Sequence, residues 1–384
     1  MRIERVVLKN WRNFREANIP LSMRTYIIGP NASGKSNLLD VFRFLRDVCK
    51  PYGGGLQKAV TDRGGISRLR CLHARRDIEV RIEIHLADPS HEDGALWRYV
   101  LGFKPEGTGA QRLLVSTEEV WMKERCLLQR PNSADKEDKQ LLTQTHLEQI
   151  QANAEFRELA DFFSGITYLH LVPQLLKYGD RIGGNRLEDD PFGQGFLERI
   201  AKAPSRVRDS RLKKIGDALS AAVPQFKEIR YKPDEATGRP HLEARYEHFR
   251  PNAGWQREEH FSDGTLRLLG LLWSLLENDS LLLLEEPELS LHTAVVEQIP
   301  LLVERIQRAS KIRRQVIMTT HSVALLSNPG IDARGVIVLE PAHEGTNART
   351  VTEEEAIALN AGLSVADVLL PKTRPKGIEQ LGLW

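Results

Sequence analysis

Hydrophobic and polar residues alternate along the first third of the chain, which is the pattern of strands that bury one face. Residues 3–8 alternate in this way, and a second strand is expected to end near Leu21, so that the two form an antiparallel pair. Three longer runs with a period of two follow, at 78–86, 97–103 and 113–122. The pattern predicts an antiparallel sheet with one face exposed to water.

Apolar residues recur at three- and four-residue spacing between Leu38 and Cys49, which predicts an amphipathic helix after the apolar run 25–28. Residues 130–163 are polar and also predict helix, without the sustained heptads of a long coiled coil. Glycine and charge dominate 178–195, which predicts a loop. Strands are further expected at 166–171, 226–231 and 241–246, and a basic helical segment at 196–222.

Two late segments are apolar throughout and do not alternate. Leu281–Leu284 is one such run, and the other is the apolar part, 316–318, of a strand expected at 315–322 that ends in a polar cluster; a strand buried on both faces of a parallel sheet has this composition. A strongly apolar helix is expected from Leu266 to Leu276. With the strand, loop and helix near residue 30, these patterns predict an α/β fold that combines a parallel sheet with the antiparallel one.

The loop that joins the first apolar run to its helix carries the strongest functional pattern. It has the spacing Gly-x-x-x-x-Gly-Lys-Ser, in which glycines let backbone amides surround a phosphate at a helix N-terminus. In such a loop the lysine contacts the β- and γ-phosphates and the serine hydroxyl binds Mg²⁺. The spacing and its context favour this interpretation over a chance glycine-rich turn. The residues are Gly29, Pro30, Asn31, Ala32, Ser33, Gly34, Lys35 and Ser36.

Three more polar groups stand where a nucleotide site would need them. Glu285 and Glu286 directly follow four leucines, a position that favours holding Mg²⁺ and orienting water over a role as ordinary surface carboxylates. His321 ends the other buried strand, although a lone histidine is more often structural. The run Ser-Asp-Gly at 262–264 precedes the apolar helix, where it is either a simple N-cap or a second phosphate-binding helix end.

Composition narrows the classes of protein that fit. The 384 residues are 41% hydrophobic and 28% charged, and the longest apolar runs are too short to span a bilayer. The N-terminus lacks an apolar signal core, and the three widely spaced cysteines, Cys49, Cys71 and Cys126, form neither a disulfide framework nor a zinc site. We therefore expect a cytoplasmic protein without membrane contact.

A basic cluster lies in the helical segment after residue 195. The net charge of +2 is too small to indicate nucleic-acid binding, so only local clustering could do so. Such a run is more often a solvated helix face, and contact with nucleic acid or an acidic partner is the alternative. The cluster comprises Arg199, Lys202, Arg206, Arg208, Arg211, Lys213 and Lys214.

Taken together, these motifs resemble the ATP-binding-cassette class of ATPases, and within it the RecF-like and SMC-like branch. Lys-Asn-Trp-Arg-Asn-Phe at 9–14, Phe-Ser-Asp-Gly-Thr-Leu-Arg at 261–267 and Glu-Glu-Pro-Glu-Leu-Ser-Leu-His at 285–292 are similar to motifs of bacterial predicted AAA-type ATPases in this branch. The resemblance covers residues 1–50 and 258–342, and the middle only loosely. It implies a P-loop ATPase head with an antiparallel β subdomain, a helical insertion, and ATP and Mg²⁺ as cofactors.

The resemblance also implies roles for single residues. Lys35 would contact the β- and γ-phosphates, and Ser36 and Glu285 would hold Mg²⁺. Glu286 would be the general base for water, and His321 would sense the γ-phosphate. Glu285 replaces the usual aspartate and adds one methylene between the backbone and the metal.

Other positions follow from the same resemblance. Gln174 would link Mg²⁺ to the lobes, with His170 as the runner-up, while Arg12 and Asn37 would contribute to nucleotide binding. The signature residues would act on ATP bound by a second subunit, which implies an ATP-dependent head-to-tail homodimer. In this signature Asp263 and Thr265 replace the usual glycine and glutamine. The signature residues are Ser262, Asp263 and Gly264.

The expected domain boundaries follow the motifs. An N-terminal lobe at 1–175 carries the phosphate loop and the antiparallel sheet, and a helical, basic insertion occupies 176–257. A C-terminal lobe at 258–345 carries the signature, the carboxylates and the histidine, and a tail at 346–384 follows. The end of the tail, Pro371–Trp384, is expected to dock a partner or the second subunit.

The sequence favours an ATPase whose dimer opens and closes to control a separate effector, such as a nuclease or toxin, or a nucleic-acid transaction in DNA repair or defence against mobile elements. One alternative is the ATPase subunit of a membrane transporter, although the motifs differ from those of transporters. Another is an enzyme with its own nuclease activity. Only one aspartate, Asp367, follows Leu339, and the segment is short for a nuclease domain.

Overall fold

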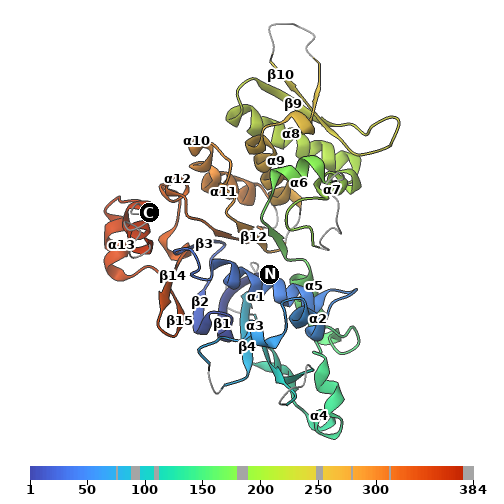
Figure 1. The fold of residues 1–384 in the computed structure, drawn as a ribbon, viewed down its shortest axis with the longest axis vertical. Coiled ribbons are helices and arrows are strands. Elements are labelled where there is room, and N and C mark those ends of the chain that lie inside the picture. Colours follow the sequence, from blue (N-terminus) through green and yellow to red (C-terminus); the bar gives the residue numbers. More distant parts are fainter. Residues whose placement is uncertain are drawn as a thin grey trace, which may run out of the picture.

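The computed structural model describes residues 1–74, 77–87, 96–107, 112–179, 189–247, 254–277, 280–310 and 313–374. A central sheet lies between an antiparallel sheet and a helical lobe, and the C-terminal helices flank the central sheet (Figure 1). The α/β class and the two kinds of sheet are as the sequence predicts. Within the described ranges, no helix combines the length and hydropathy that a bilayer crossing requires.

The antiparallel sheet is built from the alternating strands of the N-terminal part. Its strand order is β2-β1-β4-β5-β6-β7, and every neighbouring pair is antiparallel. On β4, Val80, Ile82, Ile84 and Leu86 are buried and the residues between them are half-buried, as alternation predicts. The strands are β1 (Arg2–Trp11), β2 (Phe14–Pro20), β4 (Val80–Ala87), β5 (Trp97–Pro105), β6 (Leu113–Met122) and β7 (Arg125–Arg130).

The central sheet has the order β15-β14-β3-β13-β12-β8, and only the β14–β15 pair is antiparallel. In register, Glu285 at the end of β12 lies opposite Thr319 at the end of β13, which in turn lies opposite Ile27 of β3. The carboxyl ends of these parallel strands therefore meet at one edge. The strands are β3 (Arg24–Ile28), β8 (Thr167–Leu169), β12 (Leu282–Glu285), β13 (Val316–Thr319), β14 (Val336–Ala342) and β15 (Gly345–Arg349).

Alternate residues of the central strands enter two different hydrophobic cores. Ile27 of β3 belongs to the core shared with the antiparallel sheet, whereas Tyr26 and Ile28 belong to the core of the helical lobe. On β12, Leu283 enters the first core, and Leu282 enters the second. Both faces of the sheet are buried, which explains why these strands are apolar throughout.

Helix α1 (Lys35–Cys49) fills the first core. Its apolar stripe packs between the two sheets, and Phe44 stacks on Phe103 of β5 with ring centroids 5.5 Å apart. Smaller helices cover the same lobe. They are α2 (Leu56–Thr61), α3 (Ile66–Leu69), α4 (Ser133–Glu137) and α5 (Arg157–Ser164).

The helical lobe surrounds helix α9 (Asp263–Glu277), which is buried along most of its length. A small sheet with the order β11-β10-β9 covers the outer side of this lobe. The longest helix of the described residues, α8, has 18 residues. The elements of this lobe are α6 (Pro173–Tyr178), α7 (Phe196–Lys202), α8 (Ser205–Ala222), β9 (Phe226–Tyr231), β10 (Leu242–Tyr246), β11 (Gln256–Arg257), α10 (Thr293–Val296) and α11 (Ile299–Ala309). The C-terminal helices beside the central sheet are α12 (Val323–Leu326), α13 (Glu353–Asn360) and α14 (Val365–Leu369).

The prediction of helix throughout 130–163 is wrong for residues 144–153. The backbone amides of His146 and Leu147 donate to the buried carboxylate of Glu118, at 2.8 and 3.0 Å, so they are not available for helical hydrogen bonds. Asn153 donates its side-chain amide to the carbonyl of Leu147. Side chains thus replace helical bonding in this stretch. Of the segments predicted as loop and docking tail, 180–188 and 375–384 lie outside the described residues.

Glu118 belongs to a buried charge cluster at the end of the antiparallel sheet. The side chains of Glu118 and Arg130 are fully buried, and Asp135 is 1% exposed. Arg130 bonds both carboxylates, at 2.9 and 2.7 Å, and also the carbonyls of Leu141 and Gln144. Burying two carboxylates and one guanidinium costs free energy. That cost is offset here because each charged group is paired and hydrogen-bonded within the cluster.

We expect Arg130→Met to lower the free energy of unfolding by about 3–5 kcal/mol, because it leaves two buried carboxylates without their cation. Arg125 offers a matched control, since it and its partner Glu155 are about 70% exposed. Arg125→Met should change the stability by less than about 0.5 kcal/mol. Urea denaturation followed by tryptophan fluorescence compares the two, and equal midpoints would contradict the importance of the buried cluster.

Candidate nucleotide-binding site

The loop between β3 and α1 is held in shape by the hairpin of β1 and β2. Gly34 has φ 96°, and a Cβ there would lie 2.0 Å from the side-chain nitrogen of Asn13. Asn13 is fixed because its amide donates to Ser33 O at 2.9 Å and to Thr346 Oγ1 at 2.7 Å. Both the backbone conformation and the close approach therefore require glycine at position 34.

The same hairpin is hydrogen-bonded to the first turn of α1. Asn37 donates its side-chain amide to Asn13 Oδ1, and its carbonyl accepts from Trp11 Nε1, both at 2.8 Å. The run Asn-Trp-Arg-Asn-Phe contributed to the family resemblance, but this supporting role of Asn13 was not predicted from the sequence. The position of Asn13 could have indicated this role, because the residue lies in the turn between two predicted strands that precede the phosphate loop.

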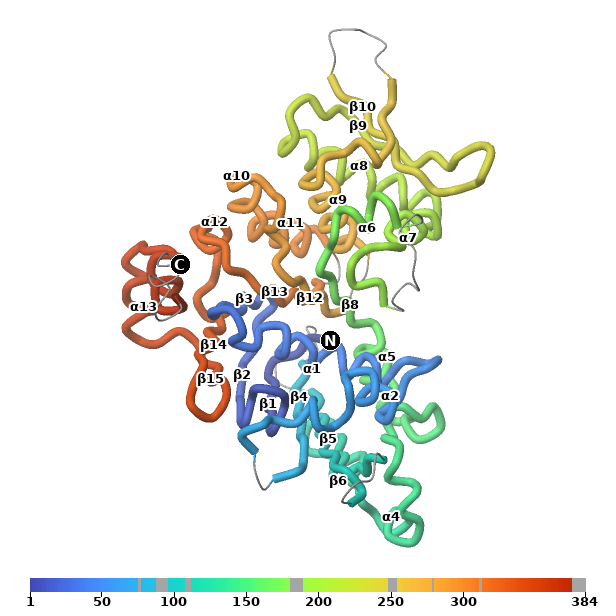
Figure 2. The backbone as a smooth tube through the Cα atoms, viewed as in Figure 1, coloured from blue at the N-terminus to red at the C-terminus, as the bar shows by residue number. Residues whose placement is uncertain are grey.

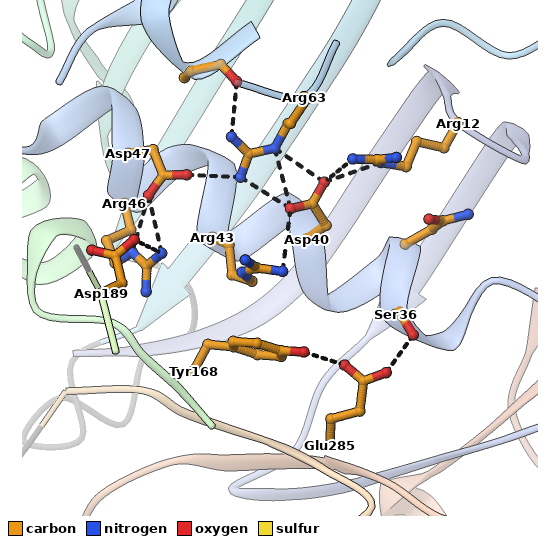
Figure 3. A network of polar contacts seen from close by, with 12 residues as sticks. Arg12, Ser36, Asp40, Arg43, Arg46, Asp47, Arg63, Tyr168, Asp189 and Glu285 are labelled. Carbon is orange, nitrogen blue, oxygen red and sulfur yellow. Dashed lines mark hydrogen bonds and ion pairs between the residues drawn. The ribbon is translucent and has the colours of Figure 1, made fainter. Parts of the chain in front are cut away.

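Arg12 lies beside α1 and is bound to Asp40. Its guanidinium donates to Asp40 Oδ2 at 2.6 and 3.0 Å, and Arg63 donates to both oxygens of the same carboxylate (Figure 3). Arg63 also reaches Asp47 at 2.8 Å, so the charges form a chain along the helix. In this structure Arg12 therefore supports α1 from the side, and its expected contact with a nucleotide stays a prediction.

Lys35 lies inside the curve of the phosphate loop. Its ammonium group donates to the carbonyls of Gly29 and Pro30, both at 3.0 Å. Burial lowers the pKa of Lys35 to about 8, and the nearby carboxylates of Glu286 and Glu285 oppose that shift. A buried, charged donor held within a loop of backbone amides is suited to phosphate oxygens, so the donor set fits the nucleotide that the motif predicts.

Ser36 and Glu285 meet at the first turn of α1. The Ser36 hydroxyl donates to one oxygen of Glu285, and the Tyr168 hydroxyl donates to the other (Figure 3). Tyr168 extends from the neighbouring strand β8, and burial raises its pKa, so its hydroxyl keeps its proton. A hydroxyl beside a carboxylate is a pair of hard oxygen ligands that Mg²⁺ accepts alongside phosphate oxygens. Sequence analysis had not assigned Tyr168 a role.

Glu286 and His321 face each other at the ends of β12 and β13. Glu286 Oε1 lies 3.7 Å from His321 Nε2. The backbone of Glu286 is left-handed, with φ 46°, and is held by bonds from its amide to the carbonyl and hydroxyl of Thr319. Burial and then the charge of Lys35 lower the pKa of His321, against the opposing effect of Glu286. The strand ends thus converge as the sequence predicted.

Glu288 is a further acid in this cluster that sequence analysis quoted but did not assign. Its Oε1 accepts from the Thr320 hydroxyl at 2.6 Å and from the His321 amide at 3.2 Å. Burial raises its pKa, although these hydrogen bonds oppose the shift. Its Oε2 is buried and has no hydrogen-bond partner among the described residues. Glu288 therefore ties the turn after β12 to the backbone that carries His321.

The signature lies at the start of α9, in the helical lobe. Ser262 Oγ accepts from the amide of Thr265 at 3.1 Å, so the capping role considered from sequence is present. A Cβ on Gly264 would come within 2.8 Å of Ser290 O, so glycine permits a close approach to the turn after Glu286. Within the described ranges, no hydrogen bond joins 262–264 to the loop 29–36.

Gln174 belongs to the signature side of the site in this structure. It lies at the start of α6 and donates to Asp263 Oδ2 at 2.9 Å, while Lys177 donates to the other oxygen at 3.2 Å. His170 packs edge-on against Phe192, with ring centroids 6.3 Å apart. For both Gln174 and His170, a link to Mg²⁺ stays a prediction.

Part of the basic cluster has structural partners. Arg208 lies 4.0 Å above the ring of Tyr231, and Arg211 lies 5.4 Å above Trp273 and donates to the carbonyl of Glu277. Arg199 pairs with Asp190 at 3.4 Å. These three arginines hold α7 and α8 to their neighbours, whereas Arg206, Lys213 and Lys214 are exposed.

Comparison with known proteins gives the family and the fold of the chain. The model of the family described as "AAA domain, putative AbiEii toxin, Type IV TA system" matches residues 24–327. A search of curated proteins gave no match. One similar solved structure is an SMC head bound to the C-winged helix domain of ScpA, at 16% identity and a TM-score of 0.56, covering 93% of this chain and 100% of that one.

Two SMC heads with coiled coils are also similar. The head from Pyrococcus furiosus, bound to the C-terminal domain of ScpA, has 14% identity and a TM-score of 0.52, covering 94% of this chain and 98% of that one. The head from Pyrococcus yayanosii has 12% identity and a TM-score of 0.50, with 93% and 98% covered. At these identities the likeness shows the fold of an SMC head. Because the family match spans most of the sequence, the chain belongs to this family of AAA ATPases.

Proposed function

We propose that the protein binds and hydrolyses ATP at the site formed by the phosphate loop and the ends of β12 and β13. The observation that supports this most directly is the meeting of Glu286 and His321 close to Lys35. A carboxylate and an imidazole beside a phosphate-binding lysine provide a base for water and a group that senses phosphate. This arrangement supports the roles that the motifs predicted.

Each residue contributes a separate step in this mechanism. Lys35 binds phosphate oxygens from a desolvated position, where its charge acts more strongly than in water. Glu286 orients the attacking water and accepts its proton, and His321, neutral because its pKa is lowered, bonds the transferred group. When bound, Mg²⁺ would neutralise charge on phosphate oxygens, with Ser36 and Glu285 as its protein ligands. Tyr168 keeps Glu285 turned toward Ser36.

The proposal includes an ATP-dependent head-to-tail homodimer. The helix end at Ser262 is suited to an anion, but in one chain it makes no hydrogen bond with the phosphate loop among the described residues. A second copy related by two-fold symmetry would bring this helix end to the nucleotide of its partner. The anchoring of Asp263 by Gln174 and Lys177 supports a fixed position for such a surface.

The proposed dimer controls a separate effector, in DNA repair or in defence against mobile elements. A partner can be controlled only if it binds the open and closed states with different affinity. Two findings support a partner: the family is described with a type IV toxin–antitoxin system, and similar SMC heads are bound to domains of ScpA. We further propose a cytoplasmic location, as expected from the sequence.

Lys35→Ala should remove ATP binding, whereas Glu286→Gln should retain binding and lower kcat by about 10²–10⁴-fold, since only the proton acceptor is lost. Because the closed dimer then cannot hydrolyse its ATP and reopen, Glu286→Gln with ATP and Mg²⁺ should elute as a dimer in size-exclusion chromatography. Phosphate release and equilibrium binding of a fluorescent ATP analogue separate the two defects. Wild-type turnover by Glu286→Gln would overturn its assignment as the base.

Ser262→Arg should leave ATP binding by the single chain intact and abolish both hydrolysis and dimerisation. Mixing this variant with Lys35→Ala tests the trans arrangement, because a mixed dimer has one site made from two intact halves. Neither variant dimerises with itself, so an equimolar mixture forms only mixed dimers with one working site each, and up to about half of the wild-type rate should return. If the mixture stays inactive at all ratios, Ser262 acts within its own chain as a cap only.

Glu288→Ala should reduce kcat by about tenfold with little change in ATP affinity, because the turn that carries His321 loses two hydrogen bonds of about 1 kcal/mol each. Glu288→Gln keeps the accepting oxygen for Thr320 and His321 and should retain most activity. Steady-state kinetics and nucleotide binding distinguish the two substitutions. An equal loss for alanine and glutamine would show that Glu288 acts through its proton or charge.

A further inference from the structure

A groove on the helical lobe, separate from the nucleotide site, has no role in the mechanism above. It runs between α8, α9 and α11, which are neighbours in the helical lobe (Figure 2), and has a volume of about 720 Å³. Its floor is apolar and includes Ile215, Leu272, Leu275 and Ile306. This is the size of a pocket that accepts several apolar side chains.

The rim of the groove is basic. Arg206 and Lys214 of α8 stand on one side and Arg305 of α11 on the other, and all three are exposed. None of them forms an ion pair within the described ranges, and no aspartate or glutamate is among the residues that line the groove. The rim therefore presents positive charges that no neighbouring lining residue neutralises. The floor beneath it is an apolar surface that is unfavourable to leave in contact with water.

Two further arginines shape the groove from within. Arg211 donates to the carbonyl of Glu277 and lies over Trp273, and Arg314 donates to the carbonyls of Ser280 and Ser274. These contacts fix the groove walls to both ends of the α9 to β12 connection. The shape is therefore set by the fold of the lobe, whereas the three rim cations extend from it.

The chemistry of the lining favours a protein segment over nucleic acid. Single-stranded nucleic acid is bound by stacking of bases on aromatic rings, and no Phe, Tyr or Trp is among the described residues that line this groove. Duplex contacts are made mainly to phosphates and would leave the leucine and isoleucine floor against water or a hydrated backbone. An amphipathic segment with acidic flanks satisfies both the floor and the rim.

We propose that this groove binds an amphipathic segment of a partner protein, with apolar anchors on one face and Asp or Glu beside them. The proposal rests on the control of a partner proposed above and assigns the surface where that partner docks. The floor helix α9 begins at the signature residue Asp263. A segment held in the groove thus contacts the same helix whose N-terminus would face the second subunit, which links the partner to the state of the dimer.

The experiment uses a display library of random 16-residue peptides, selected on the full-length wild-type protein and counter-selected on the double variant Arg206→Glu/Lys214→Glu. Enriched peptides should carry Leu, Ile, Met or Phe at helical spacing with flanking Asp or Glu. Labelled copies should bind wild-type protein in fluorescence anisotropy, and at least about tenfold more weakly to the double variant, to Arg305→Glu and to Val207→Asp, each of which alters the rim or floor.

Lys213→Glu is the matched control, because Lys213 is an exposed lysine of α8 outside the groove lining. It should change peptide affinity by less than about twofold, as expected for a charge outside the contact. ATP hydrolysis without peptide should be the same in all these variants, so loss of peptide binding and failure of the proposed ATPase are separate outcomes. No enrichment, enrichment of basic peptides, or displacement of the selected peptide by 30-base duplex or single-stranded DNA would each overturn the proposal.

Discussion

The burial of both faces of the central sheet is the constraint on which the other features depend. Each strand of β3, β12 and β13 sends alternate side chains into two cores, so the sheet cannot tilt or slip without exposing one of them. That fixed register places Glu285 opposite Thr319, and hence the acids, the histidine and the phosphate loop at one edge. The precision of the site is therefore set by apolar packing well away from it.

Around this sheet, polar contacts between distant segments set the finer geometry. Asn13 connects the hairpin of β1 and β2 to the phosphate loop and to Thr346 of β15, and Tyr168 connects β8 to Glu285. Each bond replaces water at a group that is partly buried, so its loss would leave an unpaired partner. The chain of charges from Arg12 through Asp40 and Arg63 supports α1 in the same manner (Figure 3).

Periodicity and motif spacing were enough to predict the α/β class, both kinds of sheet and the meeting of Glu285, Glu286 and His321. These features follow from local pattern and from the rule that parallel strands share their carboxyl ends. The roles of Asn13, Tyr168 and Glu288 were missed because each depends on a contact with a residue far along the chain or across a strand. Likewise, the helix expected at 144–153 fails because a distant carboxylate, Glu118, binds its amides.

The position of β3 in the sheet has a consequence for synthesis of the protein. Both neighbours of β3, namely β13 and β14, are made of residues after 315, and Thr346 supplies a bond to Asn13. The phosphate loop directly follows β3, yet β3 has no partner strand until the residues of β13 and β14 have been translated. Such long-range pairing is slow to form and leaves apolar strands exposed meanwhile. A nascent chain that stops before β13 therefore carries the phosphate loop without the neighbouring strands that position it.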